Sequence, residues 1–131
     1  MSGENEVPPV TTDSSGKFKI QFDKHYTGAE MTLSVNDGVR IRQAHLHCAP
    51  AGSNGSIVVF VAGLNSAGHD VDGKWISNAI ATDSSIVNGA CGATLADLAT
   101  SIRTGNVYVN VHSVASPGGV IRGQLEPADE D

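Results

Sequence analysis

Two short segments near the start of the chain alternate strictly between apolar and polar residues, and this alternation restricts the fold more than any other feature. Residues 17–22 read KFKIQF and residues 30–35 read EMTLSV. Successive side chains of a β-strand point to opposite faces, so each segment predicts a strand with one face on a core and the other towards solvent. The polar residues 23–28 between them predict a hairpin connection, which makes the two strands antiparallel.

Further strand-like segments and turn signals follow at short intervals. The sequence NDG at residues 36–38 predicts a turn after the second strand. Apolar or alternating runs then predict strands at residues 39–47, 56–62, 74–80, 106–112 and 120–125. Residues 93–102 have a helical period instead, since Leu95, Leu98 and Ile102 fall on one face. The pattern as a whole predicts an all-β fold, an antiparallel Greek-key sandwich or barrel with one short helix.

The length and the charge of the chain limit its domain count and its partners. With 131 residues it suits one domain, with a core over about residues 4–125 and an acidic tail at residues 126–131. Its net charge of -6 argues against nucleic-acid binding, which requires a basic surface. No apolar run is long enough to insert into a bilayer, and the first four residues lack the basic and apolar regions of a signal peptide. We therefore expect either a cytosolic protein or the mature part of a secreted one.

Two strand segments carry histidines on the face opposite their apolar residues. In residues 44–48, AHLHC, the side chains of His45 and His47 share one face, while alanine and leucine take the other. In residues 107–112, VYVNVH, His112 lies with a tyrosine and an asparagine opposite three valines. Two imidazoles one residue apart on a strand are placed to hold one metal ion, and His112 completes a three-histidine site if the two polar faces meet on the outside of the barrel. The alternative is that these histidines are solvated or belong to a structural hydrogen-bond network.

Further residues are candidates for the surroundings of this site. His25, in the first hairpin connection, is a candidate fourth ligand, with a plain surface histidine as the alternative. Uniform alternation over residues 39–47 places Ile41 and Gln43 on the face of the two strand histidines. Arg122 on the last strand can point outward near the metal, or it can form a salt bridge that fixes that strand. Imidazole suits copper, zinc, iron and nickel, so the histidines alone do not identify the metal.

Five motifs, in order along the chain, resemble the chordin-type (CHRD) domain family. They are ENEVPPV at residues 4–10, AHLH at 44–47, GSNG at 52–55, YVNVHS at 108–113 and PGGVIRGQL at 117–125. The resemblance extends over nearly the whole chain and implies a β-rich domain that is secreted, periplasmic or displayed on the cell surface. It does not by itself imply one activity.

The histidine site has a weaker resemblance to the copper-zinc superoxide dismutases. In that family an immunoglobulin-like Greek-key barrel carries copper on its outer wall, bound by a His-x-His strand and by a histidine that ends a valine-rich strand near the C-terminus. Here His45, His47 and His112 have the same order, and Arg122 follows them, as an arginine that guides the superoxide anion does in that family. The chain lacks the bridging histidine and a recognisable zinc loop. The resemblance therefore implies a copper-only site, with zinc as the alternative metal.

The two cysteines, Cys48 and Cys91, bear on the compartment in which the protein works. The resemblance to a secreted family implies a disulfide between them, as expected in an oxidising compartment. Two buried free thiols are one alternative. A copper-binding role for Cys48 is another, although on a regular strand its side chain points away from that of His47.

Three functions remain open at this point. The first is a secreted copper enzyme that dismutates superoxide, with His45, His47 and His112 as ligands and a small anion as substrate. The second is a copper carrier or store that uses the same ligands without turnover. The third is a structural or adhesion domain, with a homodimer as one form, whose histidines serve packing. Copper uptake and superoxide removal distinguish the three.

Overall fold

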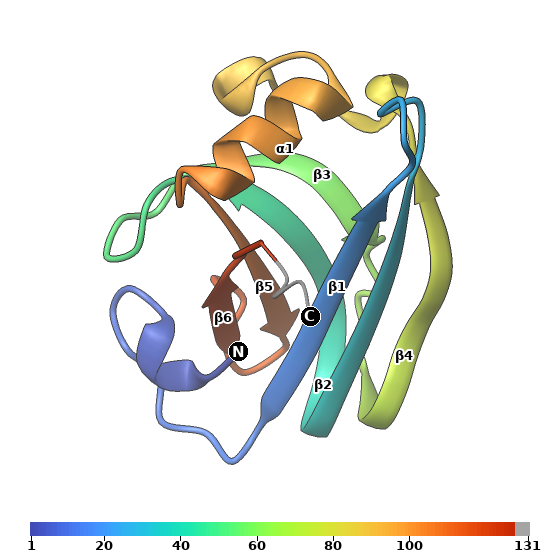
Figure 1. Cartoon of the computed structure of the whole chain (residues 1–131). Helices are drawn as coiled ribbons and strands as arrows, with labels where there is room; N and C mark the ends of the chain where they lie inside the picture. Colours follow the sequence, from blue (N-terminus) through green and yellow to red (C-terminus); the bar gives the residue numbers. More distant parts are fainter. Residues whose placement is uncertain (128–131) are drawn as a thin grey trace.

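The computed structural model describes residues 1–127, and one long strand organises it. This strand, β2 (Ala29–Cys48), runs for 20 residues and pairs with four other strands, all antiparallel. Along one edge of β2 lie β1 and then β5, and along the other edge lie β4 and then β3 (Figure 1). β6 pairs with the outer edge of β5. The bounds of these strands are Ser15–Phe22 for β1, Ser56–Ala62 for β3, His69–Ala81 for β4, Val107–Ser113 for β5 and Ile121–Gln124 for β6.

β2 bends where its partner changes from β1 to β5. Its pairing with β4 becomes irregular there, and Asp37 and Arg40 have positive φ angles of 54° and 47°. Gly38 lies so close to its surroundings that a Cβ atom would stand 2.8 Å from Cγ1 of Ile41 and 2.9 Å from the carbonyl oxygen of Val71. The prediction of two strands separated by a turn at residues 36–38 is therefore wrong. The turn signal marks a bend inside one continuous strand, because β4 pairs with β2 on both sides of the bend and follows it.

The curled sheet encloses the apolar core, and the helix α1 (Leu95–Arg103) covers one end of it (Figure 1). The predicted helical face is confirmed, since Leu95, Leu98 and Ile102 are all buried in the core. The side chain of Thr94 caps the first turn by accepting a hydrogen bond from the backbone N–H of Asp97 at 3.1 Å. The expected all-β antiparallel fold with one short helix is thereby confirmed, in the form of a half-barrel.

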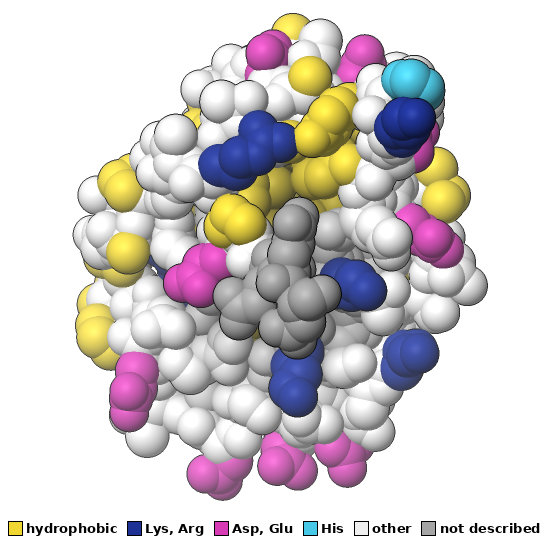
Figure 2. Space-filling view, in the orientation of Figure 1, with side chains coloured by type: hydrophobic (Ala, Val, Ile, Leu, Met, Phe, Trp, Pro, Cys, Tyr) yellow, Lys and Arg dark blue, Asp and Glu magenta, His cyan; other side chains and the backbone are white. Residues whose placement is uncertain are grey.

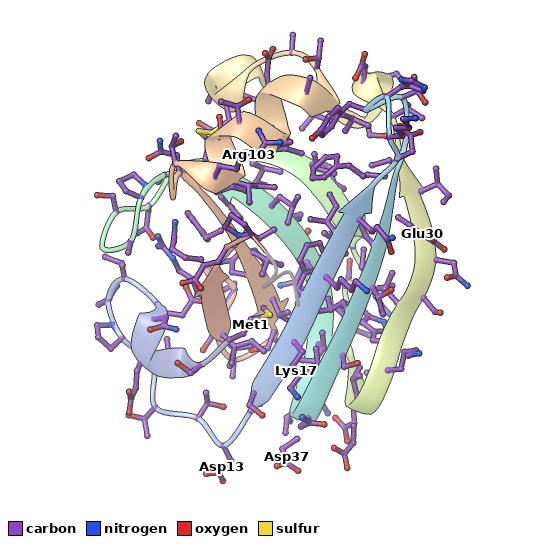
Figure 3. All side chains as sticks on the ribbon, in the orientation of Figure 1. Met1, Asp13, Lys17, Glu30, Asp37 and Arg103 are labelled. Atoms are coloured by element: carbon purple, nitrogen blue, oxygen red, sulfur yellow. A yellow bond between two sulfur atoms is a disulfide. The ribbon has the colours of Figure 1, made fainter. Side chains whose placement is uncertain are left out.

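The helix is tied to the sheet by both apolar and polar contacts. Apolar side chains gather between α1 and β1 in Figure 2, where half-buried residues of β1 and the following turn pack against the core. At the end of α1 the guanidinium of Arg103 donates a hydrogen bond to the hydroxyl oxygen of Tyr26 at 2.8 Å (Figure 3). Three 3-10 turns complete the secondary structure of the described residues: η1 (Gly3–Asn5), η2 (Asp83–Ser85) and η3 (Gly89–Cys91).

A disulfide joins the end of β2 to the segment before the helix. Cys48 and Cys91 are bonded, with 5.7 Å between their Cα atoms and a sequence separation of 43 residues. The predicted pairing is confirmed, and the readings as free thiols or as a copper-binding Cys48 are wrong. In the chain-entropy model a loop of this length stabilises the fold by about 4 kcal/mol.

The first residues of the chain connect the two sides of the half-barrel. The terminal amino group of Met1 donates to the carbonyl oxygen of Gly16 in β1 at 3.0 Å. Ser2 exchanges backbone hydrogen bonds of 3.0 Å with Arg122 in β6. Met1 accordingly lies between β6 and β1 in Figure 3. Of the predicted acidic tail, residues 128–131 lie outside the described part of the chain. No helix within residues 1–127 is long and apolar enough to cross a membrane.

Candidate metal centre

The pairing of β2 with β5 brings the three predicted histidines together. His45 and His47 lie on β2 opposite Asn110 and Tyr108, and His112 of β5 lies opposite Gln43. One nitrogen of each of the three imidazoles lies within 4.8 Å of the others, an arrangement able to hold a metal ion. The predicted convergence of the two polar strand faces is confirmed.

The histidines are more deeply buried than the sequence suggested. Their side chains are only 2% exposed for His45, 7% for His47 and 6% for His112. The loop that follows β2, the loop before β6 and the N-terminal turn around Glu6 cover this face of the sheet. The expected position outside the barrel is met, but the expected surface exposure is not, because loops cover the histidines. The imidazoles occupy a polar layer between the sheet and these loops, on the side of the sheet away from the apolar core.

An oxygen atom binds the outward nitrogen of each ring. The Nδ1–H group of His47 donates to the carbonyl oxygen of Gly55 at 3.0 Å, and that of His112 donates to the carbonyl oxygen of Pro117 at 2.8 Å. Nε2 of His45 lies 3.0 Å from Oε1 of Gln43. A carbonyl oxygen only accepts, so these contacts place the single proton of each neutral ring on the outward nitrogen. Metal-binding histidines in proteins are oriented by the same kind of second contact.

The inward nitrogens are left as lone pairs that face one another. Nδ1 of His45 lies 3.0 Å from Nε2 of His112. Nε2 of His47 is buried and makes no well-formed hydrogen bond among the described residues, although the Asn110 amide, whose Oδ1 is also buried without a partner, lies near the ring. With the outward nitrogens protonated, no ring has a second proton for these contacts. If the Gln43 amide is turned so that its nitrogen faces His45, the contact with His112 becomes an ordinary hydrogen bond, yet Nε2 of His47 still makes no well-formed hydrogen bond. A cation between the rings satisfies all three nitrogens.

Burial keeps the imidazoles in the neutral form that binds metal. It lowers the pKa of His45 to about 3, and positive charge on His112 and His47 acts in the same direction. Burial also lowers the pKa of His47 and of His112. Hydrogen bonding to Gly55 and to the Asn110 side chain opposes this for His47, and the hydrogen bond to Pro117 opposes it for His112. Neutral rings at neutral pH need not lose a proton before they bind a metal ion.

Arg122 is on the predicted face but is fully engaged by the protein. Its side chain is 1% exposed and lies over the ring of Tyr108 at 3.5 Å, and Tyr108 in turn stacks on His47 with 4.8 Å between ring centroids. The guanidinium donates to the carbonyl oxygens of Pro50 and Ser53 and to Oδ1 of Asn54, at 3.1, 2.7 and 3.1 Å. These contacts hold the loop after β2 against the site. The role in anion guidance stays a prediction.

His25 is not part of the cluster. It lies exposed in the turn between β1 and β2, beside Thr82, Asp83 and Thr94 near the start of the helix. The expectation that it reaches the site as a fourth ligand is not met, because this turn lies on the helix-capped end of the core. The position of Ile41 also differs from expectation: it is completely buried in the apolar core, because the pairing with β5 is irregular between Ile41 and Gln43.

The sequence did not point to the groups that orient the rings. The carbonyl oxygens of Gly55 and Pro117 come from loops, and a Cβ atom on Gly55 would stand 1.9 Å from the carbonyl oxygen of Cys48. Only glycine fits this position. Gly55 belongs to the motif at residues 52–55 and Pro117 to the motif at residues 117–125. These two motifs were the only indication in the sequence that the loops matter. Because a loop backbone carries no periodic pattern, its position over the histidines was not readable from the residues.

A buried carboxyl group lies beside the same layer. Glu6 is 5% exposed, and its Oε2 atom has no hydrogen-bond partner within residues 1–127. Burial raises the pKa of Glu6 to about 7, although the positive charge of Arg122 and a hydrogen bond from Asn110 act in the opposite direction. A Cβ atom on Gly119 would stand 2.5 Å from Oε2. The N-terminal turn is thus packed tightly onto the loop that holds His112.

Comparison with protein families agrees with this arrangement of motifs. The family model of the CHRD domain matches residues 1–125, which is nearly the whole chain. The chain belongs to the CHRD domain family. Neither a curated protein nor a solved structure matches it. In this CHRD domain the AHLH and YVNVHS motifs supply the three histidines of the cluster, and the GSNG and PGGVIRGQL motifs supply the covering loops.

Proposed function

We propose that this CHRD domain binds a copper ion through Nδ1 of His45, Nε2 of His47 and Nε2 of His112. The observation that carries the proposal is the buried Nε2 of His47, which makes no well-formed hydrogen bond among the described residues although the opposite nitrogen of the ring is already engaged. Buried polar atoms are nearly always satisfied, so an unpaired one beside two similar nitrogens indicates a missing ligand. A metal ion accepts all three lone pairs at once.

The donor set favours copper over zinc. Three imidazoles suit either metal, but copper(II) stands above zinc in the general order of affinity for nitrogen ligands. The weak resemblance to the copper-zinc superoxide dismutases, without their zinc loop, supports the same choice. The carboxyl group of Glu6 does not belong to the cluster, so within the described residues the donors are nitrogen only.

We further propose superoxide dismutation as the activity of the copper-loaded domain. Bound copper supplies one-electron chemistry: one superoxide gives up an electron and leaves as dioxygen, and a second takes up that electron with two protons and leaves as hydrogen peroxide. With three protein ligands, a bound ion would keep a position open for a small anion. The hydrogen bonds to Gly55, Pro117 and Gln43 would hold the three rings in one orientation around the ion.

The burial of the three rings favours a second candidate, a carrier or store of copper. Side chains that are 2–7% exposed are shielded from a substrate unless the covering loops admit it. The same burial protects a stored ion from other ligands. Either role suits an oxidising, extracytoplasmic compartment, because the Cys48–Cys91 disulfide is stable there and the family is extracellular. We therefore include secretion in the proposal.

One set of variants tests these functions together. The domain is loaded with copper(II), and metal content, the electron paramagnetic resonance spectrum and superoxide removal are measured. We expect roughly one copper ion per chain with a nitrogen-rich type 2 signal, and loss of that signal in His47→Ala. His25→Ala is the matched control, because this histidine is exposed and outside the cluster.

The outcomes separate the candidates. Copper uptake with superoxide removal that is lost in His47→Ala supports the dismutase. Uptake without superoxide removal supports the carrier. If the folded wild-type protein takes up no copper, or if His47→Ala retains the wild-type spectrum, the metal proposal is wrong and the histidines serve packing. Circular dichroism and a thermal melt of each variant show whether the fold is retained.

A further inference from the structure

Arg42 reaches the histidine layer because β2 contains an extra residue at this point. Ile41 pairs with Ser113 and Gln43 pairs with His112, so two steps along β2 correspond to one step along β5. Such a bulge turns two neighbouring side chains towards the same face. Ile41 and Ala44 on either side are fully buried in the core, which leaves Arg42 and Gln43 for the opposite face. The positive charge of Arg42 is close enough to contribute to the lowered pKa of His112.

The side chain of Arg42 is half-buried and makes no hydrogen bond in the part of the chain that the structure describes. Its Nε atom is buried without a hydrogen-bond acceptor. Arg122, the other arginine near the histidines, differs in this respect because its donors are taken up by Pro50, Ser53 and Asn54. A buried donor without an acceptor is uncommon in folded proteins and indicates a ligand that completes the contact.

We propose that Arg42 binds a small monovalent anion at the metal centre. The inference rests on the proposed copper site, because the anion is attracted by both the metal and the guanidinium. The chain as a whole carries a charge of -6, whereas Arg42 lies beside Gln43, the residue paired with His112, and is a local source of positive charge there. A guanidinium with free N–H groups suits an anion of two or three atoms, such as superoxide or azide. Arg122 instead acts as a positioning residue for the loop after β2.

Azide binding to the copper-loaded protein tests this assignment without measuring turnover. Azide is titrated into wild-type protein and into Arg42→Gln, and the absorbance change of the copper centre gives the dissociation constant. We expect Arg42→Gln to bind copper like the wild type but to raise the dissociation constant for azide at least about tenfold. Arg42→Lys, which keeps the charge and loses the planar fork, should give an intermediate value.

Arg40→Gln is the matched control, because Arg40 lies on the same strand but is exposed. It should leave azide binding unchanged. Equal azide affinity in wild type and Arg42→Gln, at equal copper content, overturns the Arg42 assignment, while the copper site stands. Failure of the wild type to bind copper overturns both proposals. The two failures are distinguished by the copper content, which is measured before the titration.

Discussion

The two halves of β2 begin from the same alternation of residues but reach different environments. In the first half Ala29, Met31, Leu33 and Val35 are buried in the core, and the residues between them are exposed or half-buried. In the second half both faces are buried, and all seven residues of the neighbouring strand β5 are buried as well. The first half therefore belongs to a part of the sheet with one face on the core and the other exposed to solvent. The second half is a sheet covered on both sides.

The covering loops account for the difference. Over the first half the outward side chains can bond to water, so a polar residue there needs no partner in the protein. Over the second half the loops after β2 and before β6 exclude water, and each buried polar atom must be satisfied within the protein or by a ligand. That is why the unpaired nitrogen of His47 is informative, whereas an unpaired polar atom on β1 is not.

The largest expected effect tests whether the halves share one core. Leu33→Ala in the first half and Leu46→Ala in the second each remove a side chain that is 0% exposed. Each variant should lower the free energy of unfolding by about 2–5 kcal/mol, measured by urea denaturation. Because Leu46 points away from the histidines, Leu46→Ala should still bind copper. If Leu46→Ala costs less than about 1 kcal/mol, the second half does not share the core in the way described.

The second prediction concerns Glu6 in the N-terminal turn that covers the second half of β2, and its expected effect on stability depends on pH. The pKa of Glu6 is raised by burial to about 7 in the folded protein, against 4.5 as the ordinary value. Its contribution to stability is therefore complete below about pH 4.5 and is lost as the pH rises through 7. The glutamine side chain of the Glu6→Gln variant does not ionise, so the variant should not show this loss. The difference in free energy of unfolding between Glu6→Gln and wild type should shift in favour of the variant by up to about 3 kcal/mol from pH 4 to pH 8.

Urea denaturation of wild type and Glu6→Gln at several pH values measures this effect. The difference between the two proteins isolates Glu6 from the buried histidines, whose lowered pKa values act with the opposite sign at acidic pH. Glu4→Gln, at an exposed position of the same turn, controls for loss of charge and should change stability by less than about 0.5 kcal/mol. A constant difference between wild type and Glu6→Gln from pH 4 to pH 8 contradicts the burial of this carboxyl group.

Much of the fold was predictable from the alternation of side chains, because a half-buried strand reports its two faces directly. The convergence of His45 and His47 with His112 was predictable for the same reason. The bend at Gly38 was not, because the same turn residues serve a hairpin or a bend, and only long-range pairing decides between them. The bulge at Arg42 was not predictable either. One extra residue moves Ile41 to the core face, and the order of apolar and polar residues in the sequence does not show where such a residue is inserted.

The burial of the site was also beyond the sequence. Alternation shows that a face is polar, but not whether water or a loop lies against it. Arg122 illustrates this: its residue type suits anion binding, yet its hydrogen bonds to the loop after β2 are visible only in three dimensions. The family motifs at residues 52–55 and 117–125 marked the loops as features without showing what they cover.

The smallest expected effect distinguishes the outward faces of the two halves. Gln43 accepts from Nε2 of His45 at 3.0 Å, so Gln43→Met removes the contact that turns the lone pair of Nδ1 towards the other rings. Loss of such a second contact weakens metal binding by about 10–100-fold, which a competition titration with a chelator measures. Gln43→Glu keeps an acceptor at this position and should retain the wild-type affinity. Glu30→Gln, on the exposed face of the first half (Figure 3), is the matched substitution and should leave copper affinity unchanged. If Gln43→Met binds copper as tightly as Glu30→Gln, the contact between Gln43 and His45 does not affect copper binding. The structural difference between the covered half and the solvent-exposed half of β2 would then have no effect on function.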